Sequence, residues 1–204
     1  MASLAAANDS YEVYFEAQDA ESSLCGQHAL NNLLQGAYFS AVDLGNIGAK
    51  LDEEEEKLLS GPSTCSQATN PSPKYSNVSL DGNFSILVLI TALKQLGVDA
   101  LPLSHPDCSA ANVGIPSLSL SLNMPCGLIL ALCACRRGDC EQEQPTKEEG
   151  FIFYQMAHWI AYRRIHGVWY DLNSQSCFLM VAPQPVAVSD FFLSAQLSKL
   201  QDEV

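Results

Sequence analysis

The chain has 204 residues, and 48% of them are hydrophobic, so we expect one domain with an ordinary core rather than a disordered chain. Its net charge of −13 opposes binding to a nucleic-acid backbone and favours a basic protein partner. It contains no run of roughly 20 apolar residues, as a membrane span requires, and no secretion signal at residues 1–10, so we expect a soluble intracellular protein whose eight cysteines are reduced.

The first predicted elements are an extended segment at residues 11–18 and a helix that begins at Cys25. Ser22 and Ser23 can cap this helix, and apolar residues follow at helical spacing until Gly36. A thiol in the first turn of a helix faces unpaired backbone N–H groups and the positive end of the helix dipole. We therefore predict that the pKa of Cys25 is lowered and that its sulfur is reactive.

The next region is predicted to be helical and then irregular. Residues 40–43 have the form of a capping box, and apolar residues at helical spacing lead from them to the acidic run at 52–56. This pattern fits two short helices or one bent helix. Residues 61–80 are rich in Ser, Pro, Thr and Asn, which is typical of a flexible loop.

A largely apolar helix is predicted to follow, capped by Asn83 and ended by Gly97. Residues 98–103 and 127–132 each read as a strand, the second one buried. Within residues 104–149 the pattern is otherwise poorly defined.

The last part of the chain is predicted to be mostly strand. Residues 151–155 begin a strand that runs towards His158, and residues 158–164 and 168–174 form a β-hairpin by their alternation and the intervening glycine. Ser189 is predicted to cap a final helix. Helices early in the chain and an antiparallel meander later indicate an α+β fold, with a cleft between the helical part and the sheet.

Three of these positions suit nucleophilic catalysis. In an antiparallel pair the first residue of one strand lies near the last residue of the next, so Asn173 is expected to reach the ring of His158. A thiol, an imidazole base and an amide that orients the base form a recurring catalytic arrangement. We therefore select Cys25, His158 and Asn173 as candidate catalytic residues.

Residues 23–36, which read Ser-Leu-Cys-Gly-Gln-His-Ala-Leu-Asn-Asn-Leu-Leu-Gln-Gly, resemble the Josephin family in its ataxin-type form. Further matching blocks follow in the same order, namely Tyr38-Phe39-Ser40, Leu51-Asp52-Glu53-Glu54-Glu55, Gly82-Asn83-Phe84-Ser85-Ile86, Ala92-Leu93-Lys94, His158-Trp159, Leu172-Asn173-Ser174 and Ser189-Asp190. The resemblance implies that residues 11–204 are a Josephin-like catalytic domain, and we expect residues 1–10 to be a disordered extension. It covers nearly the whole chain except residues 61–80 and 104–149, and relative to the family's pattern we expect residues 104–149 to hold an insertion.

The resemblance also implies a function. It implies a papain-like cysteine peptidase fold that hydrolyses bonds after the C-terminal glycine of ubiquitin without a cofactor, in the cytoplasm or nucleus. Cys25 is then the nucleophile, His158 the general base and Asn173 its orienting residue. Gln18 matches the family's oxyanion donor, on a loop to Cys25 that is longer than usual. Candidate ubiquitin contacts are Tyr38, Phe39, Ile86, Leu87, Leu96 and Trp159.

Several alternatives remain beside this interpretation. Cys25 alone would be a buried hydrophobic residue by default, and His28 is a competing base on the same helix face, which we interpret as structural because no orienting partner is evident. Four cysteines, Cys126, Cys133, Cys135 and Cys140, offer a minority zinc interpretation without the paired arms that structural zinc prefers. The rival functions are a catalytically inactive ubiquitin-binding module and a papain-like hydrolase for another modifier.

Overall fold

The computed structural model of the chain describes residues 12–19, 21–59, 76–79, 82–102, 129–133, 150–175 and 182–202. The helices are α1 (Cys25–Leu34), α2 (Ala41–Leu59), α3 (Ile86–Gln95) and α4 (Asp190–Asp202). The strands are β1 (Asp99–Pro102), β2 (Ile129–Cys133), β3 (Gly150–Gln155), β4 (His158–Ile165), β5 (Val168–Asp171) and β6 (Val186–Val188). The predictions for residues 1–10, and for most of 61–80 and 104–149, fall outside the described residues.

The helix α1 begins at Cys25, as the spacing of apolar residues predicts. Its N-cap is Leu24, which makes no side-chain cap bond, so the prediction that serines cap this helix is wrong. The Ser22 hydroxyl instead accepts a hydrogen bond from the Leu24 backbone N–H at 3.2 Å. At the other end Gln35 adopts a left-handed conformation with φ 60°, which stops the helix next to Gly36.

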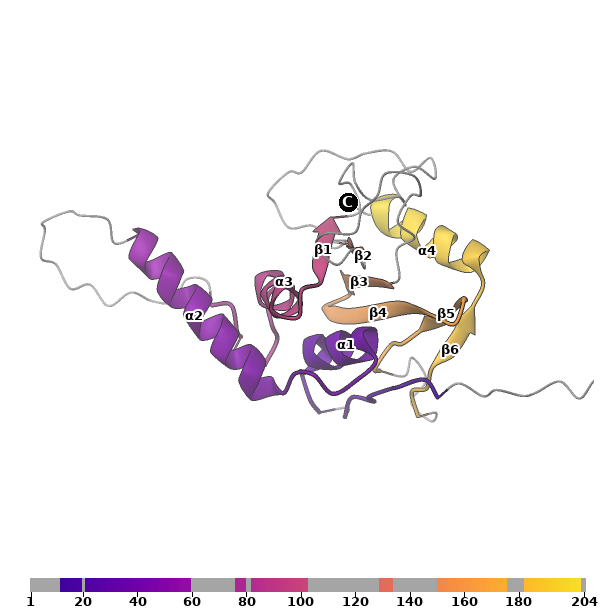
Figure 1. The fold of residues 1–204 in the computed structure, drawn as a ribbon, viewed down its shortest axis with the longest axis horizontal. Coiled ribbons are helices and arrows are strands. Elements are labelled where there is room, and N and C mark those ends of the chain that lie inside the picture. The colour runs from indigo at the N-terminus through magenta and orange to yellow at the C-terminus, as the bar shows by residue number, and fades with distance from the viewer. Residues whose placement is uncertain are drawn as a thin grey trace, which may run out of the picture.

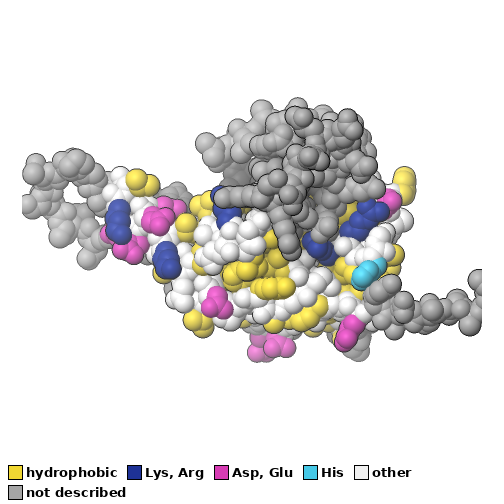
Figure 2. Space-filling model, viewed as in Figure 1, with side chains coloured by type: hydrophobic (Ala, Val, Ile, Leu, Met, Phe, Trp, Pro, Cys, Tyr) yellow, Lys and Arg dark blue, Asp and Glu magenta, His cyan; other side chains and the backbone are white. Residues whose placement is uncertain are grey.

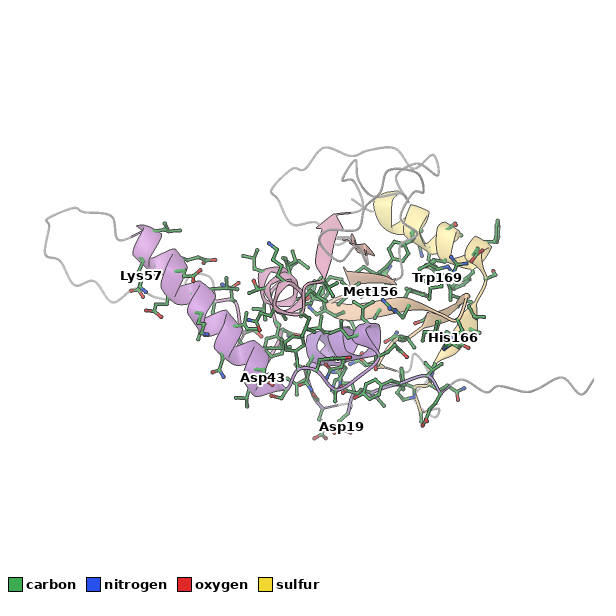
Figure 3. All side chains as sticks on the ribbon, viewed as in Figure 1. Asp19, Asp43, Lys57, Met156, His166 and Trp169 are labelled. Atoms are coloured by element: carbon green, nitrogen blue, oxygen red, sulfur yellow. The ribbon has the colours of Figure 1, made fainter. Side chains whose placement is uncertain are left out.

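The helix α2 is one continuous element of 19 residues, not two short helices. The predicted capping box is confirmed, because the Ser40 backbone N–H donates to the Asp43 carboxylate at 2.8 Å and the Asp43 N–H donates to the Ser40 hydroxyl at 3.2 Å. Leu44 and Ile47 in the first half are buried, whereas Leu58 near the far end is 83% exposed. The helix therefore projects from the body, with Asp43 at its inner end and Lys57 at its outer end (Figure 3).

The helix α3 is capped by Ser85, so the prediction that Asn83 caps it is wrong. Ser85 has extended backbone angles, and its hydroxyl accepts from the Val88 N–H at 3.4 Å, which is the geometry of an N-cap. The predicted end is close to the observed one, because Gly97 adopts φ 75° just after the helix. Asn83 is thereby left free for a contact elsewhere, which is described with the site.

The described strands form one antiparallel sheet in the order β1-β2-β3-β4-β5-β6, in which each strand pairs with its neighbours along the chain (Figure 1). The predicted hairpin of β4 and β5 is confirmed. The strand expected to run on to His158 ends at Gln155, and Met156 and Ala157, both with positive φ, turn the chain into β4. The strand β2 belongs to the sheet although it lies in the range 104–149, and β6 was not predicted.

The two faces of the sheet carry different helices. The helices α1 and α3 lie on one face, where Leu30, Leu89, Ile152 and Ala161 belong to the larger core. The helix α4 lies on the other face, over a second core made by Phe151, Phe153, Tyr162, Trp169, Leu193 and Leu197. Figure 1 shows this layering, and the labelled Trp169 lies beside α4 in Figure 3. Alternation along β3 explains it, because odd-numbered residues face α4 and Ile152 faces α1.

This arrangement confirms the predicted α+β class, with α1 and α3 packed on an antiparallel sheet and α2 packed on α3. The N-terminus of α1 meets the sheet at the start of β4, since α1 packs mainly on that strand. The cleft expected between the two parts stays a prediction. Among the described helices, none is long and apolar enough to cross a bilayer.

Candidate active site

Cys25 is the first residue of α1, and its side chain is 2% exposed. Its thiol donates a hydrogen bond to the Asn83 side-chain oxygen, with a sulfur–oxygen distance of 3.8 Å. Burial raises the pKa of the thiol, and the backbone N–H groups of Trp159, Gly26 and Cys25 itself oppose that rise. The predicted lowering of the pKa is therefore wrong, because desolvation of the thiolate outweighs the N–H groups at the helix start.

His158 is the first residue of β4, and its Nε2 atom lies 2.9 Å from the Asn173 side-chain oxygen. The Gln175 backbone N–H donates to the same oxygen at 2.9 Å. A backbone N–H can only donate, so this second bond fixes the Asn173 amide with its oxygen towards the ring. Nε2 then carries the proton, and Nδ1 is the nitrogen that can accept one.

Asn173 lies two residues after β5, in a position that several hydrogen bonds define. Its backbone N–H donates to the Asp171 carboxylate at 3.0 Å. The preceding carbonyl, that of Leu172, accepts from the Asn32 side chain on α1 at 3.3 Å. The helix that carries Cys25 thus holds the segment that carries Asn173. This bond fixes the position of the chain just after β5.

The nucleophile and the base meet at the same junction. A Cβ built on Gly26, the residue after Cys25, would lie 3.2 Å from Trp159, the residue after His158. The Trp159 backbone N–H also lowers the pKa of the Cys25 thiol, against the effect of burial. Within the described residues no hydrogen bond joins Cys25 to the His158 ring. Burial lowers the pKa of His158, while its bond to Asn173 opposes that change, so burial favours the neutral form of the imidazole as well as that of the thiol.

Gln18 is buried beside the same strand end. Its backbone N–H donates to the Ser174 carbonyl at 2.8 Å, and its side-chain oxygen accepts from the Ser174 hydroxyl at 3.4 Å. Its side-chain N–H₂ group donates to the Ser22 carbonyl, in the loop that leads to Cys25. An amide nitrogen carries two N–H donors. One of them holds the loop between Gln18 and Cys25, and the expected role of Gln18 as an oxyanion donor stays a prediction.

His28 has an orienting partner, contrary to the sequence-based interpretation. Its Nδ1 atom lies 2.8 Å from the Glu16 carboxylate. The other Glu16 oxygen accepts from the Asn31 amide at 3.0 Å and from the Tyr14 hydroxyl at 2.5 Å. The sequence carried no local signal for this cluster, because it joins the irregular segment 12–19 to α1. The cluster fixes that segment, which also carries Gln18, against the helix.

The candidate ubiquitin contacts divide into exposed and buried side chains. Tyr38, Leu87 and Leu96 are 56%, 46% and 44% exposed, and Ile86 is half-buried against the core. Phe39 and Trp159 are buried in the larger core, where Trp159 donates to the Phe84 carbonyl at 3.2 Å. Neither ring is therefore accessible as a surface contact, because both are packed in the core.

The zinc interpretation is not tested, since Cys126, Cys135 and Cys140 and the side chain of Cys133 lie outside what is described. Elsewhere in the described ranges, no group of three His, Cys, Asp or Glu side chains suits a metal ion. The expected basic partner is likewise untested. Figure 2 shows basic side chains among acidic ones along α2, whose basic residues are Lys50 and Lys57, so this view of the helix is not uniformly acidic.

Comparison with known proteins gives a consistent result over nearly the whole chain. The sequence profile of the Josephin family matches residues 20–120 and 126–204. The chain is 31% identical to ataxin-3 of Gallus gallus and of Homo sapiens, each over 90% of this chain and 41% of the relative. It is 32% identical to an ataxin-3 homolog of Arabidopsis thaliana, over 93% of this chain and 55% of the relative. The chain thus spans about half the length of the curated relatives it matches.

Proposed function

The chain belongs to the Josephin family, and from this premise we propose that it is a cysteine-dependent deubiquitinase. Its substrates are ubiquitin chains and ubiquitinated proteins in the cytoplasm or nucleus, and it cleaves the isopeptide or peptide bond after the C-terminal glycine of ubiquitin. The observation that carries the proposal is the 2.9 Å bond between His158 and Asn173 at the junction where α1 presents Cys25.

In the acylation step His158 Nδ1 accepts the thiol proton as the Cys25 sulfur attacks the glycine carbonyl carbon. The carbonyl oxygen becomes an oxyanion, and the second Gln18 N–H and the Cys25 backbone N–H donate to it. The carbon–nitrogen bond then breaks, and His158 returns the proton to the leaving amine. A thioester between ubiquitin and Cys25 remains.

In the second step water attacks the thioester, and His158 takes a proton from that water. The carbon–sulfur bond breaks, which restores the thiol with the proton from His158 and releases ubiquitin as a carboxylic acid, whose remaining proton is lost to solvent water. Asn173 orients the ring throughout and stabilises its protonated form. Every proton and electron pair is accounted for by these residues and water. A cofactor is not part of the proposed mechanism.

The exposed side chains Tyr38, Leu87 and Leu96 are the proposed ubiquitin contacts on this chain. Tyr38 comes from the segment after α1, where its backbone N–H donates to the Asn31 side chain at 3.2 Å, and Leu87 and Leu96 come from the two ends of α3. Large apolar side chains at a partly exposed site are typical of protein recognition. Their alanine variants are expected to raise KM for ubiquitin substrates and to leave kcat almost unchanged.

The test is incubation of the chain with ubiquitin that carries a C-terminal electrophile. We expect an adduct on Cys25, no adduct with Cys25→Ala, and turnover of a ubiquitin C-terminal amide that His158→Ala abolishes. Absence of the adduct on folded protein would defeat the enzyme proposal.

A catalytically inactive ubiquitin-binding module is the second candidate, and the 2% exposure of Cys25 favours it. Binding of unmodified ubiquitin without adduct formation or turnover would select that function. A stronger adduct with another ubiquitin-like modifier would select a hydrolase of different specificity. These outcomes are distinguished in one series of probes, with Cys25→Ala as the common control.

A further inference from the structure

Residues 82–84 run alongside residues 24–26 at the start of α1, and each residue of one segment lies next to one residue of the other. A Cβ built on Gly82 would lie 3.4 Å from Leu24, and a Cβ built on Gly26 would lie 3.5 Å from Phe84. Between these two contacts the Asn83 side chain meets Cys25. The segment therefore places one polar group, the Asn83 amide, directly at the sulfur.

The Asn83 backbone is held in place by bonds on both sides. The Ser79 N–H donates to the Asn83 carbonyl at 2.9 Å, and the Asn83 N–H donates to the Ser79 hydroxyl at 3.0 Å. The Trp159 indole N–H donates to the next carbonyl, that of Phe84, at 3.2 Å. Gly82 adopts φ 90°, a conformation that favours glycine. The position of the Asn83 amide is thus imposed by the fold.

The same segment is fixed to α2. The Asp52 carboxylate accepts from the Asn77 backbone N–H at 2.9 Å and from the Asn77 side chain at 2.8 Å. The Asn77 carbonyl in turn accepts from the Ser85 backbone N–H at 2.9 Å. Since Ser85 also caps α3, the segment is anchored at two helices and at the sheet.

The direction of the bond to Cys25 has a chemical consequence. A side-chain amide oxygen accepts hydrogen bonds and does not donate them, so its partner must be the protonated thiol. A hydrogen bond to the neutral form of an acid disfavours its ionisation. The contact therefore stabilises the resting thiol, and it points the thiol proton at Asn83 and not at the imidazole.

We propose that Asn83 is a positioning residue that holds the Cys25 thiol protonated and directed away from His158 until substrate displaces the contact. The turnover part of this inference rests on the proposed function. In that part, the S–H bond rotates towards His158 Nδ1, which accepts the proton as sulfur attacks the substrate. The resting sulfur is thereby protected from other electrophiles, and reactivity is coupled to substrate binding.

The neighbouring groups agree with this assignment. The contributions to the thiol pKa come from burial and from the backbone N–H groups of Trp159, Gly26 and Cys25. His158 is the titratable side chain that the mechanism pairs with the thiol, and burial, which raises the pKa of the thiol, lowers that of the imidazole. Both shifts leave the pair neutral near pH 7, which is the state that the Asn83 contact requires.

The experiment measures alkylation of Cys25 by iodoacetamide against pH in the absence of ubiquitin. Because the chain has eight cysteines, the Cys25 peptide is quantified by mass spectrometry. Asn83→Leu keeps the site covered and removes the acceptor, so we expect the alkylation midpoint to move to lower pH. At pH 7 the expected rate increase is about two- to tenfold, the effect of losing one hydrogen bond to the neutral form.

Two further variants complete the test. Asn83→Asp places a carboxylate beside the sulfur, so we expect the midpoint to move to higher pH and the rate at pH 7 to fall. Ser79→Ala removes one of the bonds that hold Asn83 but keeps the amide, so we expect its midpoint to move in the same direction as in Asn83→Leu but by less. Asn83→Ala replaces Asn83→Leu if thermal unfolding shows that the leucine variant does not fold.

A midpoint that stays constant or rises in Asn83→Leu would overturn the proposal, because the amide would then be inert or a donor to the thiolate. An equal shift in Ser79→Ala would also overturn it, by assigning the effect to the segment. The readout uses no ubiquitin, so a chain that fails to react with the ubiquitin electrophile can still pass or fail this test. The two failures are therefore distinguishable.

Discussion

Asn32 and Leu172 are 140 positions apart in the chain and 3.3 Å apart in the structure, from side-chain nitrogen to carbonyl oxygen. Asn32 is fully buried, and its amide also bonds both the backbone N–H and the carbonyl of Glu16. One amide thus joins α1, the N-terminal segment and the strand end that carries Asn173. The geometry of the site depends on this buried connection as well as on the reacting groups.

We expect Asn32→Ala to lower the free energy of unfolding by about 3 kcal/mol, because it leaves one buried N–H and two carbonyls without their partner. Urea denaturation followed by circular dichroism measures the change. Asn46→Ala, on an exposed face of α2, is the control and should change stability little. A loss in Asn32→Ala no greater than in the control would contradict the role given to the buried amide.

Asn173→Ala is expected to change the pH dependence of turnover as well as its rate. The bond to Asn173 raises the pKa of His158 against the effect of burial, so its loss lowers that pKa further. Since the base must be neutral, the acid limb of kcat/KM should move to lower pH, while kcat falls on the order of 100-fold or more. A profile of kcat/KM with a ubiquitin C-terminal amide measures both. A shift of the acid limb to higher pH would refute the orientation assigned to Asn173.

The two histidines near Cys25 should respond differently to removal. His158→Ala is expected to lower kcat by roughly 10³-fold, whereas His28→Ala should retain kcat within about tenfold and lose about 1–2 kcal/mol of stability with its bond to Glu16. His166→Asn, in the exposed β4–β5 turn, is the matched control for loss of an imidazole. Turnover measured beside thermal unfolding separates the outcomes. An equal loss of kcat in His28→Ala and His158→Ala would contradict the assignment of His158 as the base.

Asp171 is expected to make the free energy of unfolding decrease as the pH rises. Burial raises the pKa of its carboxyl in the folded chain, although the Asn173 N–H and the Tyr162 hydroxyl oppose the rise. A raised folded pKa means that the contribution to stability is present below the unfolded pKa and is lost as pH rises through the folded pKa. Asp171→Asn should remove that loss, so its stability relative to the unmodified chain should increase between about pH 4 and pH 7.

Denaturation of both chains across that pH range measures the difference. Asp43→Asn serves as a control of opposite sign, because its bonds to Ser40 lower the carboxyl pKa, and its contribution is lost as pH falls. A stability difference for Asp171→Asn that is constant with pH would show that its carboxyl does not titrate in this way.

Local patterns in the sequence predicted the elements that carry the site. The periods of α1 and of the β4–β5 hairpin are continuous, so Cys25 and His158 could be assigned to element starts before any contact was known. The hairpin also placed Asn173 near His158, and the structure has them bonded. These predictions succeeded because each rests on neighbours within one element or one hairpin.

The remaining contacts are between distant segments, and the sequence does not encode them locally. Asn83 and Ser85 are both acceptable helix caps, and only the packing of residues 82–84 on α1 decides that Ser85 caps while Asn83 meets Cys25. The partner of His28 comes from an irregular segment without periodicity. The strand β6 has three residues, too few to show an alternation. The pKa of Cys25 depends on burial, which helix position does not reveal.

The way α2 leaves the body determines how its two halves exchange amide hydrogens with solvent. Leu44 and Ile47 are buried in the core and hold the first half of α2, and Asp52 holds the segment that leads to Asn83, whereas Leu58 in the last turn is 83% exposed. Local opening can begin at that end and proceed inwards at little free-energy cost. Fraying should stop at Asp52, so we expect slow amide exchange before this residue and fast exchange after it. The boundary would show which part of α2 is held by the segment that leads to Asn83.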